Sequence, residues 1–524
     1  MRPPGSGGVP ASAALPLLDK GPPCRRRGAL QLPARRSERD AWHYSGRLLV
    51  NELELTLGWV AKTVGGTLQS GDPELPVGDV LTDSRSLRTG DVFVALKGPR
   101  FDGHAFVAEV LERGAAGAIV AKAAGSEEQD PAYGVSTRRG GGVIEVGDTL
   151  RALQDLAHGV RLAAETRVIA ITGSAGKTTT KETIAEMLAT RDRVVKNKGN
   201  LNNHIGLPLS LMQLRTRPDV AVMELGMNHA GEISRLVEIA EPDVRVWTNV
   251  GDAHLGFFAS PDAIADAKGE ILQRATAATL LVCNADDPRV MARARAFVGR
   301  TITFGTVENA DVRATLIEDR GVDGMRAHVT TPAGERFVET PLLGRGNLAN
   351  VLAATAVALD AGIALDAIVD VASRLRPADR RGAVTRLGGG IILIDDSYNS
   401  SPTALRRALE VVANESRCER KVAVLGEMLE LGDHALALHE ECGRAAAAAG
   451  LTLLFAIGGA PARALADAAV AAGMPRDSVA YFAQSAEAVA PVSAQVRRGD
   501  LVLVKGSRGT RTDLVADRLA AEFA

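Results

Sequence analysis

The sequence predicts an α/β protein built from three folded domains. The chain has 524 residues, which exceeds what a single hydrophobic core usually organises. From about residue 52 to the C-terminus, short apolar runs typical of buried strands alternate with segments of helical spacing. A polar segment with Pro and Gly at 376–382 is typical of a linker between the last two stretches. We therefore expect domains at 52–163, 164–376 and 377–524.

The composition limits the class of partner. Aromatic residues make up 3% of the chain, and the net charge is -2, so neither a base-stacking platform nor a basic field for nucleic acid is expected. No uninterrupted apolar stretch reaches the length of about eighteen residues that a membrane span needs. The four cysteines lie far apart, without metal-ligand spacing or the density of a disulfide scaffold. We expect a cytoplasmic protein, monomeric, that binds neither nucleic acid nor membrane.

The N-terminal segment 1–51 differs in composition from the rest of the chain. It is rich in Pro, Gly, Ala and Arg, and its apolar run at 11–18 is interrupted by Ser12 and Pro16, which makes it a poor signal sequence. Three interpretations stay open: a disordered tail, a transit peptide, and a translation start assigned upstream of the true one. We expect a tail without function, because regular patterning begins only near Glu52.

The first folded domain is predicted to be a small α/β unit of short strands and short helices. Apolar runs alternate with turn residues along this stretch. The predicted strands are 78–81, 90–96 and 116–121.

The central domain opens with the pattern of a doubly wound parallel sheet. A helix at about 150–164 leads into the apolar strand 167–172, a Gly-rich turn and a second helix. Further strands are predicted at 220–224, 244–250 and 279–283.

The last domain is predicted to be a second, Rossmann-like sheet. Segments rich in Ala and with helical spacing separate its apolar runs. The predicted strands are 391–394, 422–425, 453–457 and 501–504.

The Gly-rich turn after strand 167–172 predicts a phosphate-binding loop. Backbone N–H groups in such a loop and at the following helix N-terminus bind phosphates, a lysine neutralises them and a hydroxyl ligates magnesium. Lys177 and Thr178 have the matching positions, and the alternative is a Gly-rich turn without ligand. Because the first glycine is at 173 rather than 171, the loop is shorter than the common form. The predicted loop residues are Gly173, Ser174, Ala175, Gly176, Lys177, Thr178 and Thr179.

This short form of the loop, in which Lys177 is followed by Thr-Thr-Thr-Lys, resembles that of the Mur ligase and folylpolyglutamate synthase superfamily. Glu224 ends a predicted strand, and a carboxylate at the carboxyl end of a parallel strand faces the crevice where ligands bind. The resemblance implies that Glu224 binds magnesium, to which hard oxygen ligands are suited. It also implies that ATP and two magnesium ions are the cofactors.

Two further residues gain a role only from this resemblance. On their own, His254 would be an ordinary loop histidine and Lys268 a solvated helix lysine. The resemblance implies that His254 is at a second magnesium ion and that Lys268 becomes carbamylated, giving an anionic oxygen ligand.

The nucleotide site is implied by motifs in the last two domains. The segment 344–354 resembles the family's Gly-x-His-Asn-x-x-Asn helix, in which Asn347 and Asn350 match and Gly346 replaces the usual His. Arg381 has the place of an arginine on the phosphates. Asp395 matches the carboxylate that meets the ribose, although a helix N-cap is an alternative role for it.

Motifs of the first domain resemble the UDP-binding domain shared by the two latest-acting Mur ligases, and a motif at 199–209 resembles the branch that adds D-alanyl-D-alanine. The tripeptide-forming ligase carries Asp-Asn-Pro-Arg in its last domain, and no such sequence follows Arg381. Instead, 424–432 and 504–509 resemble the branch that adds D-alanyl-D-alanine. The residues expected to bind substrate are Thr82, Ser84, Arg85, Asp102, His104, Asn202 and Asn203.

The resemblance implies an ATP-dependent ligase that works through an acyl phosphate, with Lys177, Glu224, His254, Lys268 and Arg381 as its catalytic residues. The implied partners are UDP-N-acetylmuramoyl-tripeptide, ending in lysine or diaminopimelate, and D-alanyl-D-alanine. The alternatives are the tripeptide-forming ligase, a P-loop kinase and a nucleotide-gated scaffold without catalysis. The shortened loop disfavours the kinase, and the set of four residues 177, 224, 254 and 268 disfavours the scaffold.

Overall fold

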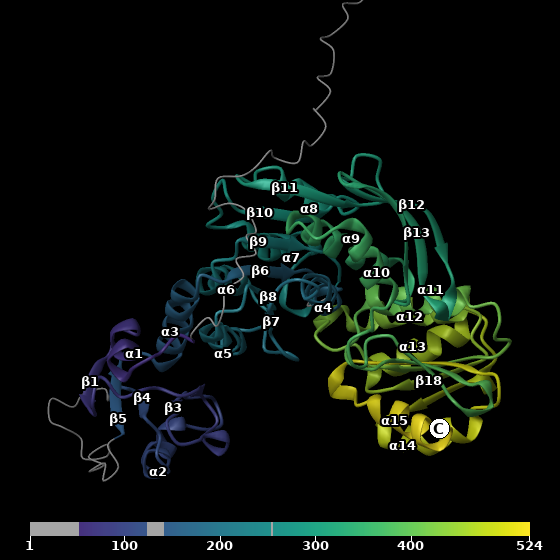
Figure 1. The fold of residues 1–524 in the computed structure, drawn as a ribbon. Helices are drawn as coiled ribbons and strands as arrows, with labels where there is room; N and C mark the ends of the chain where they lie inside the picture. The colour runs from purple at the N-terminus through teal and green to yellow at the C-terminus, as the bar shows by residue number, and fades with distance from the viewer. Residues whose placement is uncertain (1–51, 123–140, 253–254) are drawn as a thin grey trace, which may run out of the picture. The chain divides into compact units, whose positions relative to one another are not determined.

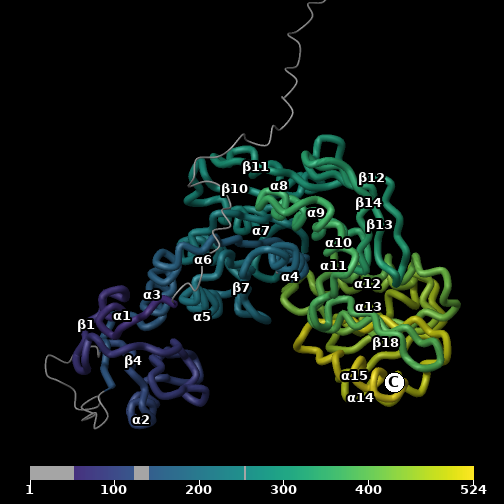
Figure 2. The backbone as a smooth tube through the Cα atoms, viewed as in Figure 1, coloured from purple at the N-terminus to yellow at the C-terminus, as the bar shows by residue number. Residues whose placement is uncertain are grey.

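The structure, a computed structural model, describes residues 52–122, 141–252 and 255–524, which belong to one compact unit. These residues form three sheets, and each sheet carries helices (Figure 1), which confirms the predicted three-domain α/β fold. The chain passes through the three sheets in sequence order (Figure 2). The boundaries proposed between the domains stay predictions. No helix of the described residues is long and apolar enough to cross a membrane.

The first sheet has five strands in the order β1-β5-β4-β3-β2, and only β1 is antiparallel to its neighbour. The segments between the short strands carry five of the seven residues predicted to bind substrate. The elements are α1 (Leu57–Thr63), β1 (Thr67–Ser70), β2 (Val80–Leu81), η1 (Ser84–Ser86), β3 (Val92–Val94), η2 (Gly103–Phe106), α2 (Val107–Glu112), β4 (Gly117–Ala121) and β5 (Gly142–Val146).

The central sheet has nine strands in the order β14-β13-β12-β11-β10-β9-β6-β8-β7. From β7 to β12 all neighbouring strands are parallel, so their carboxyl ends share one edge of the sheet. The elements are α3 (Thr149–Ala164), β6 (Arg167–Thr172), α4 (Lys177–Leu188), β7 (Val194–Lys196), α5 (Gly206–Leu211), η4 (Met212–Thr216), β8 (Val220–Glu224), α6 (Glu232–Ala240), β9 (Val244–Trp247), η5 (Leu255–Phe257), α7 (Pro261–Gly269), η6 (Glu270–Leu272), β10 (Leu280–Asn284), α8 (Pro288–Ala294), β11 (Arg300–Gly305), β12 (Val312–Asp319), η7 (Gly321–Asp323), β13 (Met325–Thr331), β14 (Gly334–Thr340), α9 (Gly344–Asp360) and α10 (Leu365–Ser373).

The central sheet differs from the prediction at one edge, where it is not parallel. Strands β12, β13 and β14 form an antiparallel extension. Along β13, buried and half-buried residues alternate, whereas β6 and β8 are almost continuously buried. Continuous apolar runs mark strands that are covered on both faces, so they predict β6, β8, β9 and β10. The parallel strands β7 and β11 and the antiparallel extension were not predicted, and β7 and β11 lack a continuously buried run.

The third sheet has six strands in the order β15-β16-β20-β17-β18-β19, and only β15 is antiparallel. This is the predicted second α/β sheet, and β18 has the predicted bounds. The elements are β15 (Ala383–Arg386), η8 (Gly388–Gly390), β16 (Ile392–Asp396), α11 (Pro402–Asn414), β17 (Lys421–Gly426), η9 (Gly432–His434), α12 (Ala435–Ala448), β18 (Leu453–Ile457), α13 (Ala460–Ala471), η10 (Arg476–Ser478), β19 (Val479–Phe482), α14 (Ser485–Gln495), β20 (Leu501–Lys505), η11 (Arg508–Thr510) and α15 (Asp513–Glu522).

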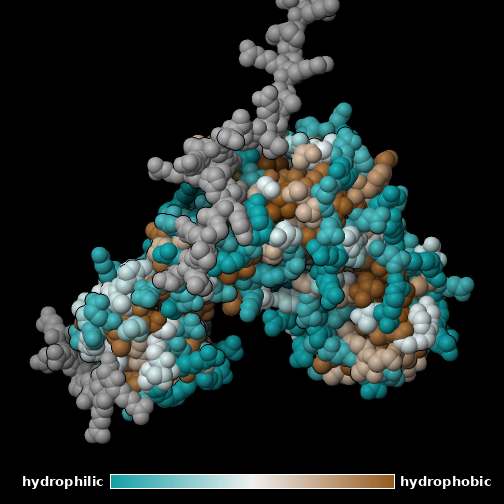
Figure 3. Space-filling view, in the orientation of Figure 1, coloured by the Kyte–Doolittle hydropathy of each residue, from teal (hydrophilic) through white to brown (hydrophobic). Residues whose placement is uncertain are grey.

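The hydrophobic cores follow the sheets. One cluster of buried residues extends from the first domain, including Leu57 and Ile144, into the central domain, including Val168 and Met223. Two further clusters lie on the two faces of the third sheet. Polar side chains cover much of the visible surface, with apolar groups between them (Figure 3). The loops at the strand ends are therefore anchored in packed cores, and they carry the site described below.

Candidate active site

The phosphate-binding loop has a backbone that requires glycine at two points. Gly173 follows β6 with φ 151°, and a Cβ there would be 1.9 Å from Thr248 Oγ1. Gly176 has φ 82° at the start of α4, and its Cβ would be 2.3 Å from Asn350 Oδ1. Both the left-handed backbone and the close approach exclude a side chain. The loop thus has the form that the sequence predicts.

Asn249, which sequence reasoning missed, holds the loop in place. Its Oδ1 accepts from Ala175 N at 2.9 Å, its Nδ2 donates to Ala175 O at 3.0 Å, and its backbone O accepts from Ser174 N at 3.0 Å. The amides of Ser174 and Ala175 are therefore engaged within the protein. The first-turn amides of α4, which have no intrahelical partner, are the groups oriented for phosphate.

Glu224 is held through all four of its polar atoms. Its carboxylate accepts from Thr178 Oγ1 at 2.7 Å and from Asn202 Nδ2 at 2.9 Å. Its backbone N–H donates to Asn197 Oδ1 at 2.9 Å, and its backbone O accepts from Asn197 Nδ2 at 3.0 Å. Asn197 is buried, and its own backbone O accepts from Lys181 Nζ at 2.6 Å. The structure thus brings three predicted residues together, and adds Asn197 and Lys181 as their support.

Charged groups around Glu224 shift one another's pKa values. Burial alone would raise the pKa of Glu224, but the charge of Lys177, the Thr178 hydrogen bond and the charges of Arg381 and Lys181 hold it below its ordinary value. Burial lowers the pKa of Lys177, and so does Arg381, against the opposing effect of Glu224 and Glu430. The Lys177 ammonium also donates to Gly173 O at 2.9 Å.

Lys268 on α7 is buried and belongs to the same group of charges. Burial lowers its pKa well below that of a free lysine, and the positive charge of Lys177 lowers it further, while Glu224 opposes the decrease. The solvated helix lysine that the sequence also allowed is excluded by this burial. His254, the other residue expected at a second metal ion, lies outside the described residues.

Thr178 and Glu224 fit a magnesium ion. A hydroxyl and a carboxylate oxygen lie 2.7 Å apart, both of them hard donors, and the acidic form of Glu224 is disfavoured by its lowered pKa. Magnesium in nucleotide sites is usually bound through one or two protein oxygens, with waters and phosphates completing its shell. In the residues that the structure describes, no cluster of three His, Cys, Asp or Glu side chains offers a complete protein cage instead.

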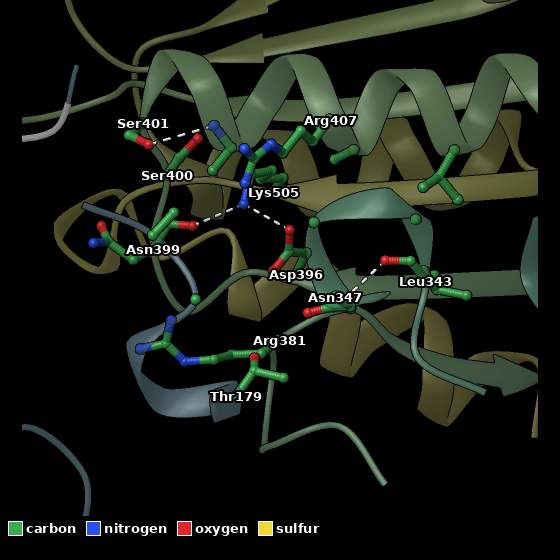
Figure 4. Close-up of a pocket in the computed structure, with 18 of the residues that line it drawn as sticks. Thr179, Leu343, Asn347, Arg381, Asp396, Asn399, Ser400, Ser401, Arg407 and Lys505 are labelled. Atoms are coloured by element: carbon green, nitrogen blue, oxygen red, sulfur yellow. Dashed lines mark hydrogen bonds and ion pairs between the residues drawn. The ribbon is translucent and has the colours of Figure 1, made fainter. Parts of the chain in front are cut away.

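A cavity of about 720 Å³ opens beside the loop (Figure 4), and the central and last domains both line it. The central domain contributes the phosphate loop and the first turns of α9. The last domain contributes α11 and the loops after β16, β17 and β20. Predicted residues on its wall are Ser174, Ala175, Gly176, Lys177, Thr179, Asn347, Asn350 and Arg381.

The last domain presents cations and a carboxylate to this cavity. The Arg381 guanidinium lies over the Tyr398 ring, 4.2 Å from its centroid. Lys505 donates to Asp396 Oδ2 at 2.6 Å and to Asn399 O at 3.0 Å (Figure 4). Asp396 and Lys505, which sequence reasoning missed, both line the cavity.

The sequence led us to expect Asp395 at the nucleotide site, but Asp395 does not line the cavity. Its Oδ1 accepts from Ser397 N at 3.1 Å and from Ser397 Oγ at 2.5 Å, and its Oδ2 is 3.8 Å from Arg380 Nη1. Neighbours along a strand point to opposite faces, so only one of the two aspartates ending β16 faces the cavity, and that one is Asp396. The ribose contact of Asp395 stays a prediction.

On α9, Asn347 and Asn350 form one connected pair. Asn350 Nδ2 donates to Asn347 Oδ1 at 3.0 Å, and Asn347 Nδ2 donates to Leu343 O at 2.9 Å. Since Asn350 also touches Gly176, this helix and the phosphate loop form one wall.

In the first domain, the predicted substrate residues are largely engaged with one another. Asp102 accepts from the backbone of His104 at 3.0 Å and from its Nδ1 at 2.6 Å, and His104 Nε2 accepts from Ala121 N at 2.9 Å. Arg85 pairs with Asp83 at 2.7 Å and is exposed. Thr82 and Ser84 are half-buried on the same turn. Nothing in these contacts decides the substrate role of the five residues Thr82, Ser84, Arg85, Asp102 and His104, which stays a prediction.

The two asparagines after β7 have different surroundings. Asn202 donates to the Glu224 carboxylate, as described above, and so lies beside the two oxygens that fit a magnesium ion. Asn203 Oδ1 accepts from Ile205 N at 3.2 Å and from Gly206 N at 2.8 Å, at the start of α5. Asn203 thus closes the turn that leads into α5, and its expected substrate contact stays a prediction.

The chain matches the Mur ligase family catalytic domain at 77–161, the Mur ligase middle domain at 171–358 and the Mur ligase glutamate ligase domain at 380–508. Fold and site thus define a three-domain ligase with a nucleotide centre between its last two domains. The chain belongs to the Mur ligase family.

Individual relatives span nearly the whole chain. The UDP-N-acetylmuramoyl-tripeptide--D-alanyl-D-alanine ligase of Bacillus subtilis (strain 168) is 34% identical over 89% of this chain and 98% of that protein. MurF from Acinetobacter baumannii has a crystal structure with a TM-score of 0.79 and 32% identity, covering 90% of this chain and 100% of that one. The MurF ligase of Thermotoga maritima in complex with ADP has a TM-score of 0.73 and 29% identity, covering 85% and 97%.

Proposed function

We propose that this chain is an ATP-dependent ligase that joins D-alanyl-D-alanine to UDP-N-acetylmuramoyl-tripeptide, forming the UDP-muramoyl-pentapeptide precursor of peptidoglycan. The observation that carries this proposal is its similarity, over 98% of the relative's length, to the Bacillus subtilis enzyme named for this reaction. The ADP complex of the Thermotoga maritima relative supports ATP as the co-substrate. The partners are thus the UDP-linked tripeptide, the dipeptide and ATP.

The site supplies what this chemistry needs. A carboxylate is a poor acyl donor because its leaving group would be oxide. Transfer of the γ-phosphoryl group of ATP gives an acyl phosphate and ADP. The amine of the dipeptide then attacks the acyl carbon, loses a proton and expels phosphate. Lys177, the first-turn amides of α4 and Arg381 present positive charge at the phosphate loop.

Magnesium would be held by Thr178 and Glu224 and would supply further neutralisation of phosphate charge. The chain's own contribution is orientation. Asn197 and Asn202 hold Glu224 in one position, and Asn249 fixes the loop, so the groups around the phosphates need little rearrangement when nucleotide binds.

A phosphate-release assay with product mass spectrometry tests the activity. We expect ADP and phosphate to form only when the UDP-linked tripeptide and D-alanyl-D-alanine are both present, with a UDP-muramoyl-pentapeptide as product. Turnover of the UDP-linked dipeptide with a single amino acid would favour the tripeptide-forming ligase and overturn the assignment. Nucleotide binding without any turnover would favour a scaffold.

We further propose that Lys268 is carbamylated and serves a second magnesium ion. Its burial and its place beside Lys177 favour the neutral amine, which adds carbon dioxide to form a carbamate and releases a proton. The carbamate is an anion with two oxygen donors, which suits a hard cation. It would also relieve the repulsion between two lysines in a buried site.

Carbon-13 NMR after incubation with labelled bicarbonate tests this proposal without an activity readout. We expect a carbamate resonance in the wild type that is absent in Lys268→Ala. Turnover of Lys268→Ala should be lost and partly restored by short carboxylic acids. Near-normal turnover of that variant in carbon-dioxide-depleted buffer would contradict the carbamate.

We also propose that the protein acts in the cytoplasm, because ATP and UDP-linked precursors are its substrates. Fractionation of cells with an activity assay tests this location. Activity confined to the membrane or to the medium would contradict it.

A further inference from the structure

Gly346 in the first turn of α9 leaves a space that a side chain of α11 occupies. Gly346 replaces the His of the family's motif, and a Cβ added there would be 3.0 Å from Arg407 Nη1 and 3.2 Å from Arg407 Cδ. The Arg407 side chain, from α11, thus lies against the backbone of Gly346. A larger residue at 346 would have to displace it.

Gly346 and Arg407 both line the nucleotide cavity, into which Arg407 projects from α11 (Figure 4). Small or apolar residues line the cavity on both helices, and polar residues stand among them. The small or apolar residues are Gly344 of α9, Leu343 just before it, and Ala404, Ala408 and Val411 of α11, and the polar ones include Arg345, Asn347 and Glu410.

The charge of Arg407 has no fixed partner in the described part of the chain, where no ion pair or hydrogen bond joins it to a carboxylate. The Arg407 side chain is exposed at the cavity; the protein around it lowers its pKa through partial desolvation, with Arg406 adding to the decrease and Glu410 and Asp287 opposing it. The guanidinium nevertheless stays charged, because the pKa of free arginine is far above neutrality. Its plane therefore remains available to a ligand in the cavity.

The position along α9 indicates which part of a nucleotide lies here. Asn350 touches the phosphate loop at Gly176, and Gly346 is four residues earlier, about 6 Å along the helix axis. The ribose separates the base of a nucleotide from its phosphates, so a position one turn from the loop suits the base. Guanidinium planes stack on aromatic rings, and the small and apolar residues of the wall offer contact area to a purine.

We propose that Arg407 packs its guanidinium plane against the purine of the bound nucleotide. The Arg407 side chain itself occupies the space beside Gly346 that a larger residue would fill. This inference rests on the proposed function only in taking ATP as the nucleotide. It makes Arg407 and Gly346 a matched pair: the glycine provides the space, and the arginine provides the surface for the base.

Calorimetric titration of the full chain with ADP and with tripolyphosphate tests the proposal. We expect Arg407→Ala to weaken ADP binding about tenfold and to leave tripolyphosphate binding within about twofold. Arg407→Lys keeps the charge but loses the plane, so it should resemble Arg407→Ala. Arg444→Ala, on the exposed face of α12, is the matched control and should bind both probes as the wild type does.

A double variant tests the pairing itself. Gly346→His alone should weaken ADP binding because the imidazole collides with Arg407, whereas Gly346→His/Arg407→Ala should recover part of the loss. Unchanged ADP affinity in both Arg407 variants would overturn the proposal, and so would an equal loss for tripolyphosphate, which would assign Arg407 to the phosphates. A wild-type chain that binds ADP but forms no pentapeptide would refute the proposed function and leave this inference standing.

Discussion

Asn197 shows how one buried side chain fixes the Glu224 carboxylate, for which we propose a role in magnesium binding. Its carboxamide takes both backbone groups of Glu224, at 2.9 and 3.0 Å, and also donates to Leu201 O at 2.8 Å. We expect Asn197→Ala to lower the free energy of unfolding by about 2–4 kcal/mol, because it leaves buried polar groups without hydrogen-bond partners. It should also raise the magnesium concentration needed for half-maximal turnover.

Thermal unfolding and a magnesium titration of turnover measure these effects. Asn309→Ala, at an exposed position, is the control and should change stability by less than about 0.5 kcal/mol. A folded Asn197→Ala enzyme with wild-type magnesium dependence would show that Glu224 keeps its position without the Asn197 hydrogen bonds.

At the scale of elements, two glycines that precede helices allow the cost of backbone strain to be distinguished from the cost of a steric clash. Gly176 and Gly231 both precede a helix with similar φ, 82° and 87°, but a Cβ on Gly176 meets Asn350 at 2.3 Å and one on Gly231 meets nothing within 4 Å. We expect Gly231→Ala to cost about 1 kcal/mol from backbone strain. Gly176→Ala should cost more and lose nucleotide binding.

Thermal melts and ADP titration of the two variants give this comparison. The added loss in Gly176→Ala measures the contact between the loop and α9. Equal melting temperatures and equal ADP affinities for the two variants would mean that Asn350 simply moves aside.

The segment after β17 is tied to α12 by a buried histidine. His439 Nε2 accepts from Met428 N at 2.9 Å, and Nδ1 bonds to Ala435 O at 2.7 Å, so the ring is neutral. Burial lowers its pKa below 6.5. The unfolded chain protonates this residue near pH 6.5 and the folded chain does not, so stability falls as the pH drops below about 6.5.

Melting temperatures at about pH 7.5 and about pH 5.5 test this dependence. We expect the wild type to lose more stability over this interval than His439→Gln, whose amide does not titrate. Because Leu429 and Glu430 line the nucleotide cavity, turnover should fall along with stability. Identical pH dependence of the two proteins would show that His439 contributes nothing to it.

The elements that the sequence predicted well are those with continuous apolar runs. Strands β6, β8 and β18 begin and end where the pattern indicates, since burial on both faces leaves an uninterrupted signal. The antiparallel strands β12 to β14 lack that signal. The phosphate loop could be predicted from the sequence for a different reason: phosphate binding requires glycine, lysine and threonine at fixed spacing.

At the scale of the whole molecule, the supports of the site could not be predicted. Asn249 contacts a loop 74 residues earlier, and Asn197 contacts Glu224 across 27 residues. Neither residue belongs to a local motif that states its role. Asp396 rather than Asp395 faces the cavity because of the orientation of β16, which a motif alone does not give. Residue type and spacing predict chemistry, whereas positioning depends on tertiary packing.

Contacts between the central and last domains adjoin the cavity that both line. Asp252 Oδ2 accepts from Thr403 Oγ1 at 2.9 Å and from Arg406 Nη2 at 3.0 Å. Nearby, Gly256 N donates to Glu430 O at 3.0 Å. Since Ala404 of the same helix and its N-cap Ser401 line the cavity, these contacts hold α11 in place relative to the phosphate loop.

Removal of the Asp252 contacts should therefore impair nucleotide use more than stability. We expect Asp252→Ala to raise the KM for ATP by roughly threefold to tenfold, from the loss of about 1 kcal/mol of domain-joining contacts. Its melting temperature should stay close to that of the wild type, because each domain keeps its own core. Asp262→Ala removes an exposed carboxylate that pairs only within the central domain and should leave KM unchanged. A wild-type KM for ATP in Asp252→Ala would mean that the two domains align on the nucleotide without this contact.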